Sequence, residues 1–268
     1  MKICQLTHEV SCSGIGIHTG AFSEIKFMPS DKEGIQFFKD GIRIPAKPEF
    51  VVKTKRGVVL GKDGISVQTV EHLLAAVRWL GISSLEVQIK GEEIPILDGS
   101  SSGWIDLIEP HLNKTSRDFS QVFIKKSLLI EQTDAFIKIS PSNSFSVQYT
   151  IDFPFALIGT QVWQGEISPE IFKSEIAPAR TFGFMEEIDS LRKERLTMGG
   201  NLENCVVITK DSILTPLRYK DEPIRHKVLD FLGDLSLLSW HPVGKFEIFK
   251  GGHSLHVLMA ETLENQIQ

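Results

Sequence analysis

The amino-acid sequence predicts an α+β fold built from two structurally similar halves. Residues 22–38 and 134–150 both read as a strand, a Pro-Ser turn and a second strand. At one constant offset, five residues of the first segment recur in the second: Ile25 as Ile137, Lys26 as Lys138, Pro29 as Pro141, Ser30 as Ser142 and Gln36 as Gln148. Turns share a common composition, so a chance likeness between two hairpins is the alternative.

The order of the later elements favours a true repeat. In each half a long amphipathic helix precedes a β-rich stretch: residues 69–80 come before 83–91, and residues 223–238 come before 244–252. The polar run 113–120 has the Asn, Ser and Asp content of a solvated linker. We therefore expect an N-terminal α+β domain over residues 1–115 and a C-terminal α+β domain over residues 116–268.

One segment of the second half has no counterpart in the first. In the stretch 179–201, Phe184, Met185, Ile188 and Leu191 follow helical spacing, and a Gly-Gly pair at 199–200 ends the pattern. We expect an insert near residues 177–215, and insertions of this kind often carry function.

Composition excludes several classes of function. The chain has 268 residues, 41% of them hydrophobic and 24% charged, as in ordinary globular proteins. Its net charge is −5 and it has no basic block, so bulk binding to nucleic acid is not expected. No apolar run is long enough to span a membrane, although peripheral contact stays open. Three cysteines without a CxxC spacing, and a start that does not read as a signal peptide, predict a reduced cytoplasmic compartment.

The helix predicted over 223–238 carries polar groups along one otherwise apolar ridge. His226, Asp230 and Asp234 recur every four residues, so each lies one turn beyond the last on the same side of the helix. Burying such groups without partners would cost several kcal/mol. His-x-x-x-Asp offers a nitrogen and an oxygen ligand that suit zinc, while an ordinary i,i+4 pair between the two side chains is the alternative.

A second candidate lies at the start of the helix predicted over 69–80. Thr69 reads as its N-cap, and Glu71 and His72 follow in the first turn. Together with His226 and Asp230, His72 would complete the three protein ligands that a catalytic zinc site uses. Glu71 could then accept the proton of an attacking water. The alternative is an acidic residue favoured by the helix dipole beside a half-buried histidine.

Three further motifs each admit a functional and a structural interpretation. His253 follows two glycines after a β-rich stretch and could act as a general acid, or lie in a surface loop. Thr181 could donate a hydrogen bond to a developing oxyanion and Phe182 could form an apolar wall, or both could end a strand in the core. The glycine-rich segment 13–20 is not followed by a helix, so we interpret it as a strand-to-strand turn rather than a phosphate loop.

Taken together, the motifs TVEHLLAA, EIPILDGSS, ARTFGFMEEIDSL, RHKVLDFLGDL and GGHSL resemble one enzyme family over essentially the whole chain. The sequence is similar to the zinc-dependent UDP-3-O-acyl-N-acetylglucosamine deacetylases of Gram-negative bacteria, which act at the committed step of lipid A synthesis. The resemblance implies two α/β sandwich domains of similar topology, each with an insert, and an active site between them.

The resemblance also implies a role for individual residues. His72, His226 and Asp230 match the zinc ligands, and Fe²⁺ is a possible occupant of such a site in cells. Glu71 matches the residue that activates water, His253 the histidine near the leaving group, Asp234 the carboxylate that steadies it, and Thr181 the oxyanion donor. The positions that match substrate contacts are Lys227 for phosphate, Phe182 and Ile188 for the acyl chain, and Phe153 for the uridine ring.

The expected activity is therefore hydrolysis of the N-acetyl amide of an acylated UDP-sugar by a cytoplasmic monomer, without a nucleic-acid partner. A metallo-amidohydrolase acting on another acylated amino sugar is one alternative. A non-catalytic binding module whose His and Asp residues only pair in the core is a second alternative, and it predicts no bound metal.

Overall fold

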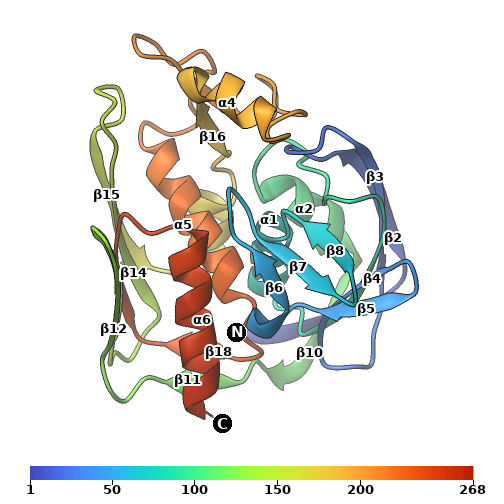
Figure 1. The fold of residues 1–268 in the computed structure, drawn as a ribbon. Helices are drawn as coiled ribbons and strands as arrows, with labels where there is room; N and C mark the ends of the chain where they lie inside the picture. Colours follow the sequence, from blue (N-terminus) through green and yellow to red (C-terminus); the bar gives the residue numbers. More distant parts are fainter. Residues whose placement is uncertain (268) are drawn as a thin grey trace.

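Two five-stranded sheets with the same topology dominate the computed structural model, which describes residues 1–267 (Figure 1). The first sheet has the order β2-β3-β9-β4-β5 and the second the order β12-β13-β19-β14-β15. In each, the third and fourth strands run parallel and the other neighbours antiparallel. The predicted likeness of the two halves is thus confirmed, as is the α+β class.

The strands of the first sheet are β2 (Val10–Ile15), β3 (Phe22–Met28), β4 (Gly34–Lys39), β5 (Ile42–Pro45) and β9 (Ser84–Lys90). Those of the second are β12 (Leu128–Gln132), β13 (Ala135–Ser140), β14 (Ser146–Asp152), β15 (Thr160–Glu166) and β19 (Lys245–Phe249). The matched residues Ile25 and Ile137 lie on β3 and β13, the second strand of each sheet, and both side chains are buried. The sequence repeat therefore marks equivalent core positions.

Four longer helices lie between and beside the sheets. They are α1 (Glu71–Trp79), α2 (Ser102–Ile108), α5 (Glu222–Leu235) and α6 (His253–Ile267). In the first half, Trp104 of α2 packs edge-on against Phe27 of β3. In the second half, α5 contacts β14 and β15 while α6 contacts β12 and β13. Every residue of α1 is buried, and α1 packs against both α2 and α5.

Each half carries an insert, and the two inserts touch. The first holds η1 (Pro48–Phe50), β6 (Val51–Lys53), β7 (Val59–Lys62) and β8 (Ile65–Gln68), and the second holds β16 (Phe182–Phe184), η4 (Met185–Glu187), α4 (Ile188–Lys193) and β17 (Val206–Ile208). Arg56 forms an ion pair of 2.7 Å with Glu187, and Lys55 pairs with Glu194. The helix of the second insert starts later than predicted, because Phe184 lies in β16 and stacks on Phe155.

The predicted linker at 113–120 is largely a strand, which corrects the expectation of a solvated loop. β10 (Leu112–Asp118) pairs antiparallel with β1 (Lys2–Leu6), and β11 (Gln121–Phe123) then pairs parallel with β18 (His241–Val243). Most side chains of β10 are exposed, so their polarity reflects a surface strand rather than a flexible joint. The remaining short elements are η2 (Glu109–His111), α3 (Pro169–Ile171) and η3 (Phe172–Ile176).

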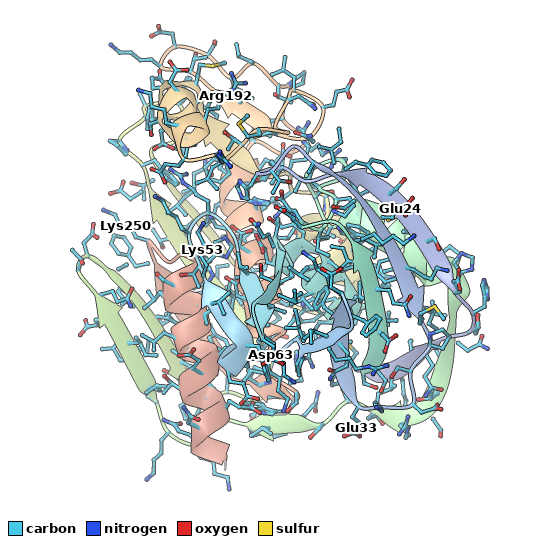
Figure 2. The ribbon with its side chains drawn as sticks, turned by 45° about the vertical axis from the view of Figure 1, so that its right-hand side comes forward. Glu24, Glu33, Lys53, Asp63, Arg192 and Lys250 are labelled. Carbon is cyan, nitrogen blue, oxygen red and sulfur yellow. The ribbon has the colours of Figure 1, made fainter. Side chains whose placement is uncertain are left out.

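Charge is mixed over the surface. Acidic and basic side chains are interspersed in the view of Figure 2, among them Glu24, Glu33, Lys53, Asp63, Arg192 and Lys250. Within residues 1–267, no helix has both the length and the apolar character that crossing a bilayer requires.

Candidate active site

The contact between α1 and α5 sets the geometry of the site. Gly233 of α5 lies against the backbone of Glu71, and a Cβ atom at position 233 would overlap the carbonyl oxygen of Glu71. A glycine there lets the first turn of α1 approach α5 closely. As a result, His72 faces the ridge of α5 that carries His226 and Asp230.

The three predicted metal ligands lie together in the buried interior. His72, His226 and Asp230 are exposed by 5%, 2% and 2% respectively. Oδ1 of Asp230 lies 3.7 Å from Nε2 of His72 and 3.2 Å from Nε2 of His226. One ligand atom from each residue falls within 4.8 Å of the others, so the group can hold a metal ion.

The hydrogen bonds around this group leave acceptor atoms facing each other. Nδ1 of His226 lies 3.1 Å from the carbonyl oxygen of Ala179, which only accepts, so Nδ1 carries the proton. A neutral His226 then turns the lone pair of Nε2 toward Oδ1 of Asp230, a buried atom without a hydrogen-bond partner among the described residues. Two such acceptors repel unless a cation lies between them. Zinc–ligand bonds of about 2.0–2.2 Å in a tetrahedron place neighbouring ligand atoms about 3.3–3.5 Å apart, which fits these side chains.

Glu71 lies beside the ligand group and is almost completely buried. Its Oε2 accepts a hydrogen bond of 2.9 Å from the backbone N–H of Val58, while Oε1 lies 3.9 Å from Nε2 of His253. Burial raises the pKa of Glu71, and the nearby His253 and His72 oppose that shift. A carboxyl group whose pKa is moved toward neutrality, with one free oxygen at the site, is suited to accept and return a proton.

His253 opens α6 and is held by Asp234. Its Nδ1 donates to Oδ2 of Asp234 over 2.8 Å, and its Nε2 points toward Glu71 and Asp230. Burial disfavours the charged imidazole, but the attraction of Asp234, Asp230 and Glu71 outweighs it and raises the pKa of His253 to about 9. These interactions favour the protonated form of His253. Its side chain is 10% exposed and the residue opens a helix, so the surface-loop alternative for this residue is wrong.

A cavity of about 460 Å³ opens onto these groups. Thr181, Phe182 and Phe153 lie on its wall, and the rings of Phe182 and Phe153 meet edge to face with centroids 5.7 Å apart. Ile188 starts α4 and is not part of this lining, whereas Leu191 of the same helix is. Both inserts contribute to the cavity, since Thr54 and Arg56 of the first also line it.

Lys227 lies at the rim of the same cavity and contacts a predicted metal ligand. Its Nζ is 2.6 Å from Oδ2 of Asp230 and 5.8 Å from the centre of the Phe182 ring. Burial raises the pKa of Asp230, but its interactions with His226, Lys227 and His72 more than compensate and hold it well below its usual range. In this arrangement Lys227 neutralises the ligand carboxylate, and a phosphate contact would require its ammonium group to turn outward.

Comparison with known proteins identifies the family of this chain. The family model for UDP-3-O-acyl N-acetylglycosamine deacetylase matches residues 4–265. The chain belongs to this family. It is 37% identical to the UDP-3-O-acyl-N-acetylglucosamine deacetylase of Helicobacter pylori (strain ATCC 700392 / 26695) over 98% of this chain and 91% of the relative. It is 38% identical to the Aliarcobacter butzleri protein of that name (98% and 90%) and 39% identical to the Aquifex aeolicus one (95% and 90%).

The structure of this family member adds residues that the sequence patterns did not indicate. His256 donates from Nδ1 to Asp234, and Tyr149 contacts the other ring nitrogen of His256. Glu93 is fully buried and binds the glycine-rich segment 16–20. His256 could have been found from its spacing, because it lies three residues after His253 at a helix start. Nothing local in the sequence indicated Tyr149 or Glu93.

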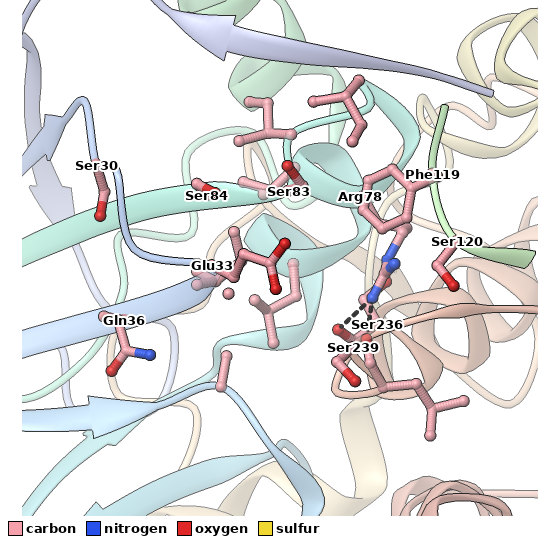
Figure 3. Close-up of a pocket in the computed structure, with 18 of the residues that line it drawn as sticks. Ser30, Glu33, Gln36, Arg78, Ser83, Ser84, Phe119, Ser120, Ser236 and Ser239 are labelled. Atoms are coloured by element: carbon pink, nitrogen blue, oxygen red, sulfur yellow. Dashed lines mark hydrogen bonds between the residues drawn. The ribbon is translucent and has the colours of Figure 1, made fainter. Parts of the chain in front are cut away.

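A larger cavity of about 640 Å³ lies elsewhere, near the C-terminal ends of α1 and α5 (Figure 3). Arg78 of α1 crosses its edge, packs on the ring of Phe119 with 4.6 Å to the ring centre, and donates to the carbonyl oxygens of Ser236 and Leu238 (Figure 3). It thereby satisfies carbonyl groups beyond the last turn of α5. None of the predicted site residues lines this cavity. Because Arg78 lies on α1 and its acceptors follow α5, we interpret Arg78 as a structural contact between the two halves.

Proposed function

We propose that this protein removes the N-acetyl group of UDP-3-O-acyl-N-acetylglucosamine, giving acetate and UDP-3-O-acyl-glucosamine, the committed step of lipid A biosynthesis. The observation that carries this proposal is the buried group of His72, His226 and Asp230 beside Glu71 and His253, in a chain that belongs to the deacetylase family. The spacing of the three ligands leaves acceptor atoms that need a cation between them.

Zinc is the proposed metal, held by Nε2 of His72, Nε2 of His226 and Oδ1 of Asp230, with Fe²⁺ as the possible occupant in cells. Two imidazoles and one carboxylate suit either ion. When bound there, zinc would polarise the amide carbonyl and lower the pKa of a nearby water toward about 7. His226 is already oriented for this role, because its bond to Ala179 fixes which nitrogen is free.

The remaining residues supply proton transfer and charge stabilisation. Glu71 accepts the proton of the attacking water, since its Oε1 faces the site while Oε2 is anchored to Val58. His253, a cation held by Asp234, stabilises negative charge that develops on the carbonyl oxygen and donates a proton to the departing amine. The hydroxyl of Thr181, on the cavity wall, donates a further hydrogen bond to that oxygen.

Substrate contacts follow from the cavity wall. Phe182 is proposed to line the passage for the acyl chain and Phe153 to contact the uridine ring, and both lie on that wall. Ile188 is proposed for the acyl chain from the family resemblance, although it lies outside the cavity lining. Lys227 is proposed to turn from Asp230 toward a phosphate once the metal neutralises that carboxylate. We propose a cytoplasmic monomer that acts on this small molecule, with peripheral membrane contact possible.

The test is an assay of acetate release by the purified protein. Zinc-loaded protein should deacetylate UDP-3-O-acyl-N-acetylglucosamine, and it should act far more slowly on UDP-N-acetylglucosamine without the acyl chain. A chelator should abolish turnover, and zinc or Fe²⁺ should restore it, with metal analysis reporting one ion per chain. Absence of acetate release from the acylated substrate by metal-loaded protein would overturn the proposal.

A further inference from the structure

Asp234 has a second histidine partner that the proposed reaction does not use. Its Oδ2 accepts from Nδ1 of His253 and from Nδ1 of His256, each over 2.8 Å, while its Oδ1 has no partner among the described residues. The two histidines are three residues apart at the start of α6 and so lie on one side of the helix. A single carboxylate oxygen thus receives both imidazole donors.

The far side of His256 is closed by a tyrosine from the second sheet. Oη of Tyr149 on β14 lies 2.9 Å from Nε2 of His256, and both side chains are buried. Burial, with the negative charges of Asp230 and Asp234, raises the pKa of Tyr149 well above its usual value, so its hydroxyl keeps the proton. The carboxylate of Asp234 only accepts, so His256 carries its proton on Nδ1, and the Tyr149 hydroxyl donates to the unprotonated Nε2.

The backbone at the Gly-Gly pair before His253 leaves room for this contact. A Cβ atom on Gly251 would lie 2.8 Å from Oη of Tyr149 and 3.0 Å from Nε2 of His256. A Cβ contact that short requires something to shift, so a side chain at 251 would push the tyrosine and histidine apart. The absence of a side chain at Gly251 thus preserves the hydrogen bond between Tyr149 and His256.

We propose that His256 and Tyr149 are positioning residues that fix the carboxylate of Asp234 for His253. Asp234, which only accepts, requires the proton of His256 to be on Nδ1, and the hydroxyl of Tyr149 anchors the ring from the Nε2 side. His256 then donates to Oδ2, and that second donor keeps Asp234 from turning away from His253. The chain of hydrogen bonds runs from the second sheet to the reacting groups without touching substrate. This inference rests on the proposed function, because it assigns the residues a role in that reaction.

A second metal site and a purely structural histidine would each give different predictions. Asp234, His253 and His256 are close enough in space to be considered as ligands of one ion. However, the two N···O distances of 2.8 Å are hydrogen-bond lengths, shorter than the roughly 3.3 Å that two ligands of one tetrahedral ion require. A purely structural histidine would matter for packing, and any side chain of similar volume would then serve equally well.

Substitutions at His256 separate the donated hydrogen bond from packing. In His256→Asn the amide nitrogen replaces Nδ1 as the donor to Asp234, whereas His256→Leu fills the space and donates nothing. Loss of such supporting partners typically costs about 10–100-fold. We expect kcat of the zinc-loaded protein to fall by about that factor in His256→Leu, to stay within about fivefold of wild type in His256→Asn, and KM to change by less than about threefold in both.

Tyr149→Phe and a control variant complete the set. Tyr149→Phe removes only the hydroxyl that anchors Nε2 and leaves the ring of His256 freer to turn, so kcat should fall about 3–10-fold. Phe27→Leu, a buried change in the first sheet far from this chain of bonds, should lower stability without changing kcat. Equal losses in His256→Leu and His256→Asn, or losses under twofold in every variant, would refute the positioning role.

A spectroscopic measurement makes the proposal independent of turnover. The ¹⁵N spectrum of zinc-loaded protein should show His256 protonated at Nδ1 and unprotonated at Nε2, and Tyr149→Phe should shift the Nε2 resonance because that nitrogen loses its donor. A His256 protonated at Nε2 in the wild type would overturn the proposal even if the protein is an active deacetylase. Wild-type protein that releases no acetate would instead overturn the proposed function, and the same spectra would still decide whether the hydrogen-bond chain exists.

Discussion

The buried carboxylate of Glu93 should be a major determinant of stability. Glu93 is fully buried and accepts hydrogen bonds from the backbone N–H groups of His18 and Thr19 and from the hydroxyls of Thr19 and Thr69, over 2.7–3.1 Å. A Cβ on Gly16 would overlap this carboxylate. The glycine-rich segment therefore does wrap around an anion, but the anion belongs to the protein itself.

The size of the effect follows from the donors that would be stranded. Glu93→Ala leaves two backbone N–H groups buried without a partner, and each such group costs about 1–3 kcal/mol. The free energy of unfolding should therefore drop by about 2–6 kcal/mol, a large share of the roughly 5–15 kcal/mol of a typical domain. Glu93→Gln keeps one oxygen and the shape of the side chain, so its loss should be smaller than that of Glu93→Ala.

Urea unfolding followed by fluorescence measures this difference. The neighbouring Glu92 is exposed and provides a matched control, since Glu92→Ala should change stability by less than about 0.5 kcal/mol. If Glu93→Ala costs less than about 1 kcal/mol, water or a rearranged loop satisfies the donors, and the account of this segment as an internal anion site is wrong.

Three further outcomes are expected. Glu71→Gln should retain bound metal, by elemental analysis, while kcat falls by about 10²–10⁴-fold; a loss under twofold would exclude Glu71 as the base. Gly233→Ala should separate α1 from α5, costing about 1–3 kcal/mol in urea unfolding and weakening metal affinity in a competition titration; unchanged affinity would contradict the close approach to Glu71. His241 has its pKa lowered to about 4, mainly by burial, so its neutral form is favoured in the folded state. The stability that neutral His241 contributes is fully present above about pH 6.5 and is lost as the pH falls toward 4. Between pH 7.5 and 5 this lowers the free energy of unfolding by about 2 kcal/mol. His241→Phe should remove that part of the acid sensitivity, and an identical pH dependence in both proteins would refute it.

Much of the fold could be predicted because local sequence patterns indicate its strands and helices. The repeated strand-turn-strand segments correspond to β3–β4 and β13–β14, and the two amphipathic helices to α1 and α5. The strand at 112–118 could not be predicted in the same way, because its polar side chains carry no alternation of buried and exposed positions. Its partner is β1, at the opposite end of the first half of the chain, and only the tertiary structure supplies that pairing.

The candidate site residues could likewise be predicted only where the signal is local in the sequence. Residues that share a helix face, such as His226 and Asp230, are recognisable from spacing alone. Thr69 looked like a helix cap for the same local reason, yet its backbone has φ of +57° and its hydroxyl donates to Glu93 instead. Tertiary contact overrode the local preference there, and a positive φ at a β-branched residue indicates a position held by its surroundings.

The pseudo-symmetry of the fold explains why the candidate ligands come from such distant parts of the chain. α1 precedes β9 and α5 precedes β19, and these two strands hold the same central place in their sheets, so the helices are equivalent elements of the two halves. Packing the halves together brings equivalent helices face to face, with His72 on one and His226 and Asp230 on the other. Neither half alone contains three ligands, so a metal bound there would join the two halves, and its removal should loosen their contact as well as stop the reaction.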